Sequence, residues 1–240
     1  MPNKSPEPMP VITITGLPEC GSDVVGREVA GLTQSKFVDD EIHEEMSLRL
    51  RRSVGEIRAL ELSYRSWWSR TLRASVNSWE RYAWHDSGFE MGGDWFGGLD
   101  HGQDDYLTEY QYQRALKGVI RKLAREGKVV MHGHGSHLFV PSDVRVLRVL
   151  VTATEGLRAR RAEVQLGLSH RHARKWLKRA DRAAVSMFQH LLENELLDES
   201  QYDLVLNLED MSYEMAAQQV ITTLGFTSRQ GGFRELLPTT

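Results

Sequence analysis

The stretch Pro10–Ala30, PVITITGLPECGSDVVGREVA, constrains the fold most strongly, because it reads as a strand, a glycine turn and a helix. Residues 11–15 are all β-branched, as in a buried strand of a parallel sheet. Gly16 and Gly21 bracket the turn, and apolar residues with helical spacing follow it. Such a junction directs free N–H groups and the positive end of the helix dipole at an anion. It predicts an α/β fold with a phosphate-binding turn, and a tight turn without a ligand is the alternative.

The turn departs from the phosphate-binding pattern Gly-x4-Gly-Lys-Ser/Thr at two positions. Gly16 and Gly21 satisfy the glycines, but Ser22 stands where the lysine belongs and Asp23 where the hydroxyl belongs. A carboxylate at position 23 repels phosphate unless it points away or holds a metal ion.

Composition narrows the class of protein. A chain of 240 residues with 40% hydrophobic and 26% charged residues fits one globular domain, or one domain with an insertion. The net charge of −3 gives no reason to expect nucleic acid as a partner. The single cysteine, Cys20, excludes an internal disulfide and favours the cytoplasm. No apolar run reaches the roughly 20 residues that span a bilayer, so we expect no membrane role.

Apolar runs and helical patterns alternate along the chain. The runs give five strands, each followed by a helix, which predicts a three-layer α/β fold with a five-stranded parallel sheet and helices on both faces. The expected strands are residues 11–15, 36–38, 129–131, 144–152 and 202–207. The later helices are expected at 41–52, 106–126 (capped by Thr108 and ended by Gly127), 169–197 (capped by Ser169) and 212–224. We expect a single domain over 10–226, a disordered leader over 1–9 and a flexible tail over 227–240.

Residues 50–105 do not fit this alternation and are expected to be a helical and loop insertion. Four tryptophans lie among arginines between residues 65 and 84, a mixture that stacks bases or, more commonly, packs an amphipathic helix on the body. A glycine- and acid-rich loop follows over 85–105. The aromatic residues leave a homodimer or partner-protein contact open.

Two further stretches carry charge or metal-ligand chemistry. Asp39 and Asp40 follow the second strand, either at the ligand-binding rim of the sheet or as the cap of the next helix. Three histidines lie in residues 132–137, but no nearby cysteine or carboxylate completes a ligand set, so we expect no metal there.

A basic segment over 158–182 indicates a polyphosphate ligand, with a solvated helix face as the alternative. Its nine basic residues are Arg158, Arg160, Arg161, Arg171, Arg174, Lys175, Lys178, Arg179 and Arg182.

Several segments in order resemble the cytidylate kinase-like family of P-loop nucleoside monophosphate kinases, and they cover most of the chain outside residues 50–100. These segments are VITITGLPECGSDVVGREVA, FVDDEI, LTEYQYQRALKGVIRKLAREGKVVMHGHGS, DVRVLRVLVTATEGLRARR, GLSHRHARKWLKRADRAA and YDLVLNLEDMSYEMA.

The resemblance implies transfer of the γ-phosphoryl group of ATP, with Mg²⁺, to a CMP- or dCMP-type monophosphate. It assigns the nucleotide phosphates to Gly16, Gly21, Ser22 and Arg160, with a basic lid over 154–185 that closes on ATP. Catalytic roles fall to Arg158, Arg161 and Asp181. Acceptor binding falls to Asp40, His134, Arg179 and Arg182.

Two departures from the family pattern leave an alternative function open. The Gly-Arg-Gly after the third core strand is Gly133-His134-Gly135 here, and Ala184 replaces an arginine expected after Asp181. Imidazole is a weaker phosphate ligand than guanidinium. The chain is therefore expected to be either a nucleotide kinase with altered acceptor choice or a non-catalytic nucleotide sensor or interaction module.

Overall fold

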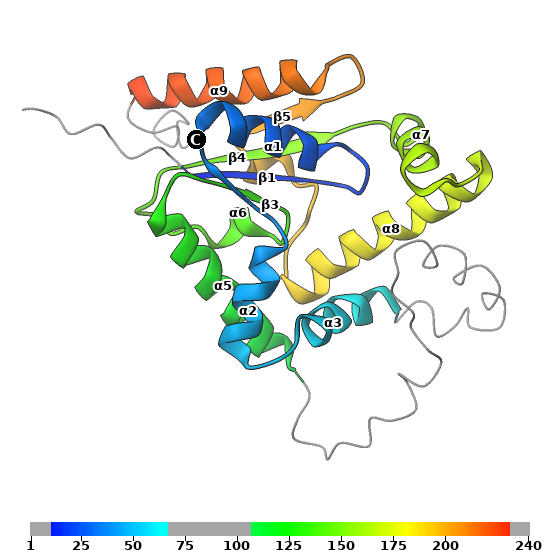
Figure 1. Ribbon diagram of the computed structural model, residues 1–240, viewed down its shortest axis with the longest axis horizontal. Helices are drawn as coiled ribbons and strands as arrows, with labels where there is room; N and C mark the ends of the chain where they lie inside the picture. The colour runs from blue at the N-terminus through cyan, green and yellow to red at the C-terminus, as the bar shows by residue number, and fades with distance from the viewer. Residues whose placement is uncertain (1–10, 67–106, 231–240) are drawn as a thin grey trace, which may run out of the picture.

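The computed structural model describes residues 11–66 and 107–230, and these form an α/β fold around one parallel sheet (Figure 1). The sheet order is β2-β3-β1-β4-β5, and every pairing is parallel. The strands are β1 (Val11–Gly16), β2 (Lys36–Val38), β3 (Val129–His132), β4 (Val146–Thr152) and β5 (Leu204–Asn207). The predicted fold class and the five-stranded parallel sheet are confirmed.

Strand β1 lies at the centre of the sheet, between β3 and β4. Ile14 is in register with His132 of β3, and Gly16 is in register with Val151 of β4. The carboxyl ends of β1 and β3 are therefore adjacent. Ligands of open α/β sheets bind at such carboxyl ends, where neighbouring connections leave in opposite directions.

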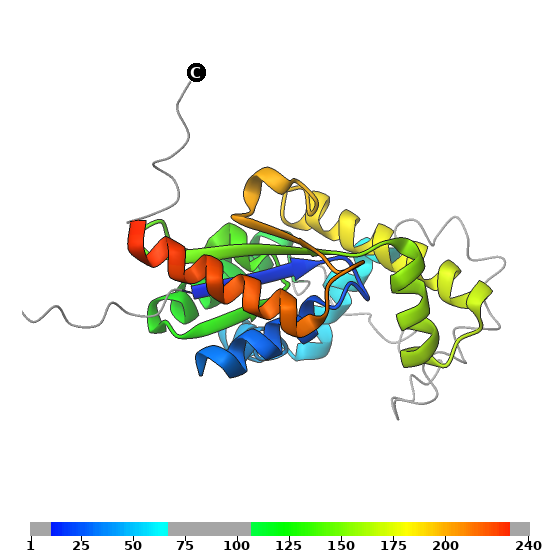
Figure 2. The same cartoon turned by 90° about the horizontal axis from the view of Figure 1, so that it is seen from above.

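Helices cover both faces of the sheet (Figures 1 and 2). On one face, α1 (Ser22–Thr33) and α9 (Tyr213–Gln230) bury a core with Ile12 and Ile14. On the other face, Val11 and Met131 join a second core formed with α2 (Glu41–Leu50), α3 (Val54–Ser66), α5 (Glu109–Glu126) and the end of α8 (His170–Leu191). The short helix α6 (Ser136–Phe139) and the 3₁₀ turn η1 (Glu199–Gln201) complete the described elements.

Helices α7 (Glu155–Leu166) and α8 form a hairpin that extends past the carboxyl end of the sheet (Figure 1). Buried alanines on both helices, including Ala159 and Ala173, let the two backbones pack closely. This hairpin is the segment that the sequence assigns to a lid.

The helix boundaries follow local chemistry. Thr108 accepts a hydrogen bond from the Gln111 N–H, and the Gln111 side chain accepts one from the Thr108 N–H, so a capping box starts α5 at Glu109. Gly127, with φ of 71°, ends this helix as predicted.

Two predicted boundaries are wrong. Helix α8 ends at Leu191 rather than near 197, because the chain turns at Glu193, whose φ is 51°. Helix α9 continues to Gln230, past the predicted end at 224, so the first residues of the predicted tail are helical.

Several predictions fall on residues that the structure does not describe. These are the leader over 1–9, the tryptophan-rich and glycine-rich residues of the insertion from 67 on, and the last ten residues of the tail. Within the described ranges, no helix has both the length and the apolar character needed to cross a membrane.

Candidate functional site

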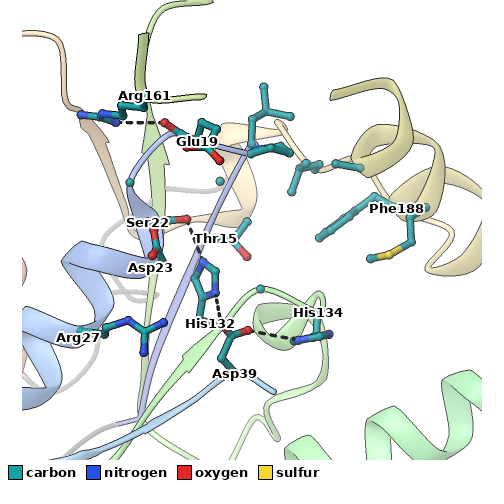
Figure 3. Close-up of a pocket in the computed structure, with 18 of the residues that line it drawn as sticks. Thr15, Glu19, Ser22, Asp23, Arg27, Asp39, His132, His134, Arg161 and Phe188 are labelled. Carbon is teal, nitrogen blue, oxygen red and sulfur yellow. Dashed lines mark hydrogen bonds and ion pairs between the residues drawn. The ribbon is translucent and has the colours of Figure 1, made fainter. Parts of the chain in front are cut away.

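A pocket opens at the carboxyl ends of β1 and β3, and residues of α7 and α8 contribute to its lining (Figure 3). Most of the lining comes from the turn after β1, the first half of α1, Asp39 after β2, the loop after β3, and residues of α7 and α8. The residues that line the pocket include Thr15, Gly16, Glu19, Gly21, Ser22, Asp23, Arg27, Asp39, His132, His134, Arg161 and Phe188.

The turn after β1 requires glycine at both predicted positions. A Cβ atom on Gly16 would collide with the Cys20 sulfur and with the carbonyl oxygen of Val151. Gly21 has a φ of 91°, and a Cβ atom there would lie 2.5 Å from the Tyr213 ring. Helix α1 begins at the next residue, so its first N–H groups lie beside the pocket. The turn thus has the strand, glycine and helix arrangement of a phosphate cradle.

Ser22, His132 and Asp39 form a connected chain of polar groups in the pocket (Figure 3). His132 Nε2 lies 2.9 Å from Ser22 Oγ, and His132 Nδ1 lies 3.3 Å from Asp39 Oδ2. His134 Nε2 lies 3.5 Å from the other Asp39 oxygen. Burial raises the pKa of Asp39, but the interactions with His132 and His134 outweigh it and hold the pKa well below its ordinary value. Asp39 is therefore an anion that orients both imidazole rings.

Asp40, the neighbour that the sequence assigns to acceptor binding, does not line the pocket. Its side chain is 78% exposed and accepts a hydrogen bond of 2.8 Å from Arg58. It holds the N-cap position of α2, but its side chain makes no capping hydrogen bond. Asp39 occupies the position at the rim of the sheet instead.

Arg161 is the member of the basic segment that reaches the pocket. Its Nη1 donates to the carbonyl oxygens of Glu19 and Cys20 at 3.2 and 2.5 Å, and its guanidinium lies 5.1 Å from the Tyr213 ring centroid. These hydrogen bonds connect α7 to the turn after β1 and stabilise it. Glu19 itself has a raised pKa, because of burial and then because of the charge of Asp23.

Arg158 and Asp181 pair with each other across the α7–α8 hairpin. Two hydrogen bonds of 2.7 and 2.9 Å join the guanidinium to both carboxylate oxygens, and Arg158 also donates to the Pro18 carbonyl at 3.0 Å. Arg158 is 5% exposed. This pair lies outside the pocket lining, and the hydrogen bond to Pro18 connects it to the turn.

The remaining predicted arginines lie outside the pocket lining. Arg160, Arg179 and Arg182 are exposed on the outer faces of α7 and α8. Periodicity explains this placement, because Arg158 and Arg161 lie one turn apart on the inner face of α7 whereas Arg160 faces away.

Arg27 and His132 are among the pocket residues that the sequence did not assign to a site. Arg27 lines the pocket from α1, with its guanidinium 4.6 Å from the Phe37 ring centroid. Its i, i+4 spacing from Asp23 puts both residues on one face of the helix, and this spacing was the signal in the sequence. His132 was considered only as a metal ligand. Its position at the end of a strand beside β1 was the signal for a role in the pocket.

The pocket also contains oxygen atoms of the kind that Mg²⁺ prefers. Asp23 lines it with a carboxylate, and the buried hydroxyl of Thr15 has no hydrogen-bond partner among the described residues. Glu19, Asp23 and Asp39 oppose only Arg27 and Arg161 in the lining, so a polyphosphate would need an accompanying cation. The residues present therefore fit a magnesium–phosphate ligand.

Comparison with known proteins places the fold. A solved structure of an uncharacterized protein from Eubacterium ventriosum is similar with a TM-score of 0.58 at 12% identity, over 90% of this chain and 98% of that one. A shikimate kinase from Acinetobacter baumannii in complex with shikimate is similar with a TM-score of 0.46 at 12% identity, over 91% and 94% of the two chains. No curated protein matches the sequence.

A match to a family model assigns the chain to a protein family, which structural similarity at such low sequence identity does not do. The model of the cytidylate kinase-like family matches residues 11–210, which include all five strands and the whole pocket. The chain belongs to the cytidylate kinase-like family.

Proposed function

We propose that this protein is an ATP-dependent phosphotransferase whose acceptor is a nucleoside monophosphate of the CMP or dCMP type. The observation that carries the proposal is the turn from Gly16 to Ser22, which meets the N-terminus of α1 at the edge of a pocket between β1 and β3. This arrangement provides N–H donors and a helix dipole for phosphate, with space beside them for a second substrate.

The turn and two arginines would bind the nucleotide. Gly16 and Gly21 allow the backbone to approach the phosphates, and Ser22 offers its hydroxyl in place of the lysine ammonium. Arg161 and Arg27 line the same pocket and would supply positive charge. Arg158 and Asp181 would act indirectly, by holding the turn through Pro18.

Asp23 is a better magnesium ligand than Asp40, because only Asp23 lines the pocket. Bound Mg²⁺ would neutralise charge on the phosphates. His134, on the opposite side of the pocket from Arg161 (Figure 3), would contact the acceptor together with Asp39.

A nucleotide sensor without turnover is the second candidate function. The observation that favours it is the loss of cationic groups: Ser22 replaces the lysine, His134 replaces an arginine, and Arg160, Arg179 and Arg182 lie outside the pocket lining. A cytoplasmic location and a dimer contact through the insertion stay predictions.

The first test is thermal unfolding with ATP, CMP, dCMP, UMP and AMP, each with and without Mg²⁺. A ligand at 100 times its Kd stabilises the native state by about 2.7 kcal/mol. Stabilisation by ATP with Mg²⁺ and by one monophosphate supports the proposal, and formation of ADP with both present distinguishes the kinase from the sensor. The absence of any shift would overturn both functions.

Matched variants identify the magnesium ligand. Asp23→Asn should abolish the part of the ATP shift that depends on Mg²⁺, whereas Asp40→Asn should leave it unchanged. The opposite result would assign the metal to Asp40.

A further inference from the structure

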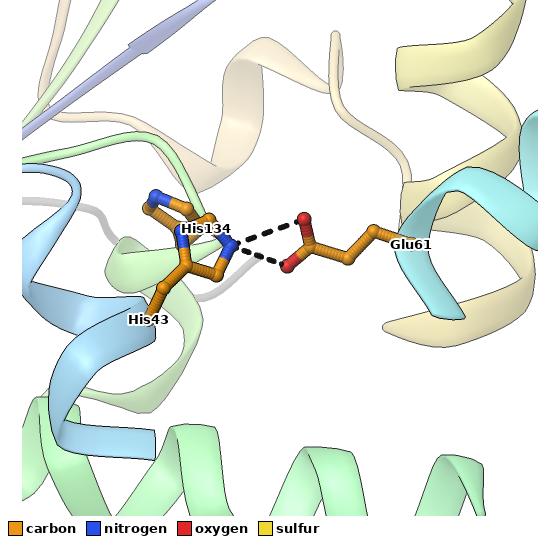
Figure 4. A group of neighbouring side chains, drawn as sticks. All are labelled: His43, Glu61 and His134. Carbon is orange, nitrogen blue, oxygen red and sulfur yellow. Dashed lines mark hydrogen bonds and ion pairs between the residues drawn. The ribbon is translucent and has the colours of Figure 1, made fainter. Parts of the chain in front are cut away.

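A second cluster of ligating side chains lies next to the pocket, formed by His43, Glu61 and His134 (Figure 4). They come from α2, from α3 and from the loop between β3 and α6, so their proximity is a product of the tertiary fold. One donor atom from each lies within 4.8 Å of the donor atoms of the other two. From the sequence we expected no carboxylate to complete a ligand set for His134. That expectation is wrong, because the fold brings Glu61 close to it.

We propose that His43, Glu61 and His134 bind a divalent transition-metal ion such as Zn²⁺. Two imidazoles and one carboxylate are a known ligand set for such ions with an open position. Mg²⁺ favours oxygen ligands throughout, so this site is distinct from the proposed magnesium site at Asp23.

The spacing of the donor atoms fits a small ion. Tetrahedral ligands about 2.1 Å from Zn²⁺ lie roughly 3.4 Å from one another. His43 Nε2 already lies 2.9 and 3.1 Å from the two Glu61 oxygens. An ion between them would replace this hydrogen bond, and the donor atom of His134, which lies within 4.8 Å of the other two, would move closer to complete three ligands.

Neighbouring groups hold two of the ligands in the way that metal sites require. Tyr112 donates its hydroxyl proton to Glu61 Oε1 at 2.6 Å, which fixes the carboxylate. Asp39 Oδ1 contacts His134 Nε2, which leaves His134 Nδ1 for an ion. A carboxylate behind a ligating histidine is a recurrent feature of protein metal sites.

The cluster is shielded from water on most sides. The exposed fractions of the side chains of His43, Glu61 and His134 are 6%, 16% and 13%. His134 also lines the pocket, so a metal ion here would lie at the pocket rim, where a water molecule or a substrate oxygen can take the fourth position.

Calorimetric titration of the full chain with ZnCl₂ in a non-chelating buffer tests the proposal, with Co²⁺ absorption spectra as a second readout. We expect one tight site in the wild type and a tetrahedral Co²⁺ spectrum. Glu61→Gln and His134→Asn should each weaken binding by at least about 100-fold. Asparagine suits position 134, because its φ is 53°.

Glu163→Gln is the matched control. Glu163 also pairs with a histidine, His170, at 2.6 Å, but no third ligand accompanies that pair within residues 11–66 and 107–230, so the variant should bind Zn²⁺ like the wild type. Circular dichroism checks that each variant is folded. Absence of tight binding in the wild type would overturn the proposal, as would wild-type affinity in a folded Glu61→Gln protein. Neither result bears on ATP binding, which is measured separately.

Discussion

His132 Nε2 lies 2.9 Å from Ser22 Oγ, which joins the end of β3 to the first turn of α1. The serine that replaces the expected lysine is therefore not a free hydroxyl, because a histidine held by Asp39 orients it. The turn after β1 and the loop after β3 form one hydrogen-bonded unit.

Arg161→Ala should weaken nucleotide binding. Arg161 holds the turn through two carbonyl oxygens and lines the pocket, and a charged hydrogen bond contributes about 1.5–3 kcal/mol. Calorimetry with ATP and Mg²⁺ should show a loss of roughly tenfold to 100-fold. Arg160→Ala is the matched control, because Arg160 is exposed outside the pocket lining and should bind like the wild type. Equal affinities for the two variants would contradict the role of Arg161.

Asp181→Ala should destabilise the fold. The change leaves the guanidinium of Arg158 buried without its carboxylate, and breaking a buried pair in this way costs about 3–5 kcal/mol. Urea denaturation measures the free energy of unfolding. Glu155→Ala, which removes the exposed partner of Arg174, should have a much smaller effect. If Asp181→Ala unfolds at the urea concentration of the wild type, the pair does not support the turn.

Gly21→Ala and Gly31→Ala should change stability in opposite directions. At Gly21 the left-handed backbone costs an L-residue about 1–2 kcal/mol, and the new methyl group meets Tyr213. At Gly31, inside α1, the methyl group enters open space and alanine favours the helix by about 0.5–1 kcal/mol. Urea midpoints that shift in the same direction for both variants would exclude this account of the turn.

Stability should fall in acid because of His137. Its ring contacts those of Phe188 and Tyr202, and burial, followed by the charge of Arg148, lowers its pKa from 6.5 to about 4. The folded state thus stays neutral at His137 where the unfolded chain takes up a proton. From pH 6.5 down to 4, this residue should remove about 3 kcal/mol from the free energy of unfolding.

His137→Phe tests this pH dependence in urea. The difference in unfolding free energy between wild type and variant should stay constant above pH 7 and change by about 3 kcal/mol between pH 6.5 and 4 in favour of the variant. A difference that is constant over the whole range would show that His137 is not the group responsible.

The sequence predicted most of the fold because its signals are local. The β-branched run before Gly16 and the Thr108 cap depend on residues within a few positions of one another, and both predictions are confirmed. The end of α8 was wrong because the turn at Glu193 carries no glycine or proline signal.

The candidate site was harder to predict than the fold, because the residues that interact in it are distant from one another in the sequence. Asp39 and Asp40 are equivalent as a sequence pattern, and only the position of β3 turns Asp39 towards His132. Likewise, the basic segment indicates an anion, but the pairing of Arg158 with Asp181 rather than with a ligand depends on how α7 packs on α8.

The central position of β1 has a consequence for biosynthesis. Both of its neighbours, β3 and β4, lie more than a hundred residues further along the chain, and Ser22 and His132 are 110 positions apart. A ribosome adding 5–20 residues per second needs on the order of ten seconds to reach them. Throughout that interval the strand Val11–Gly16 lacks both of its sheet neighbours, so the nascent chain carries an apolar segment with two unpaired edges, a feature that favours aggregation.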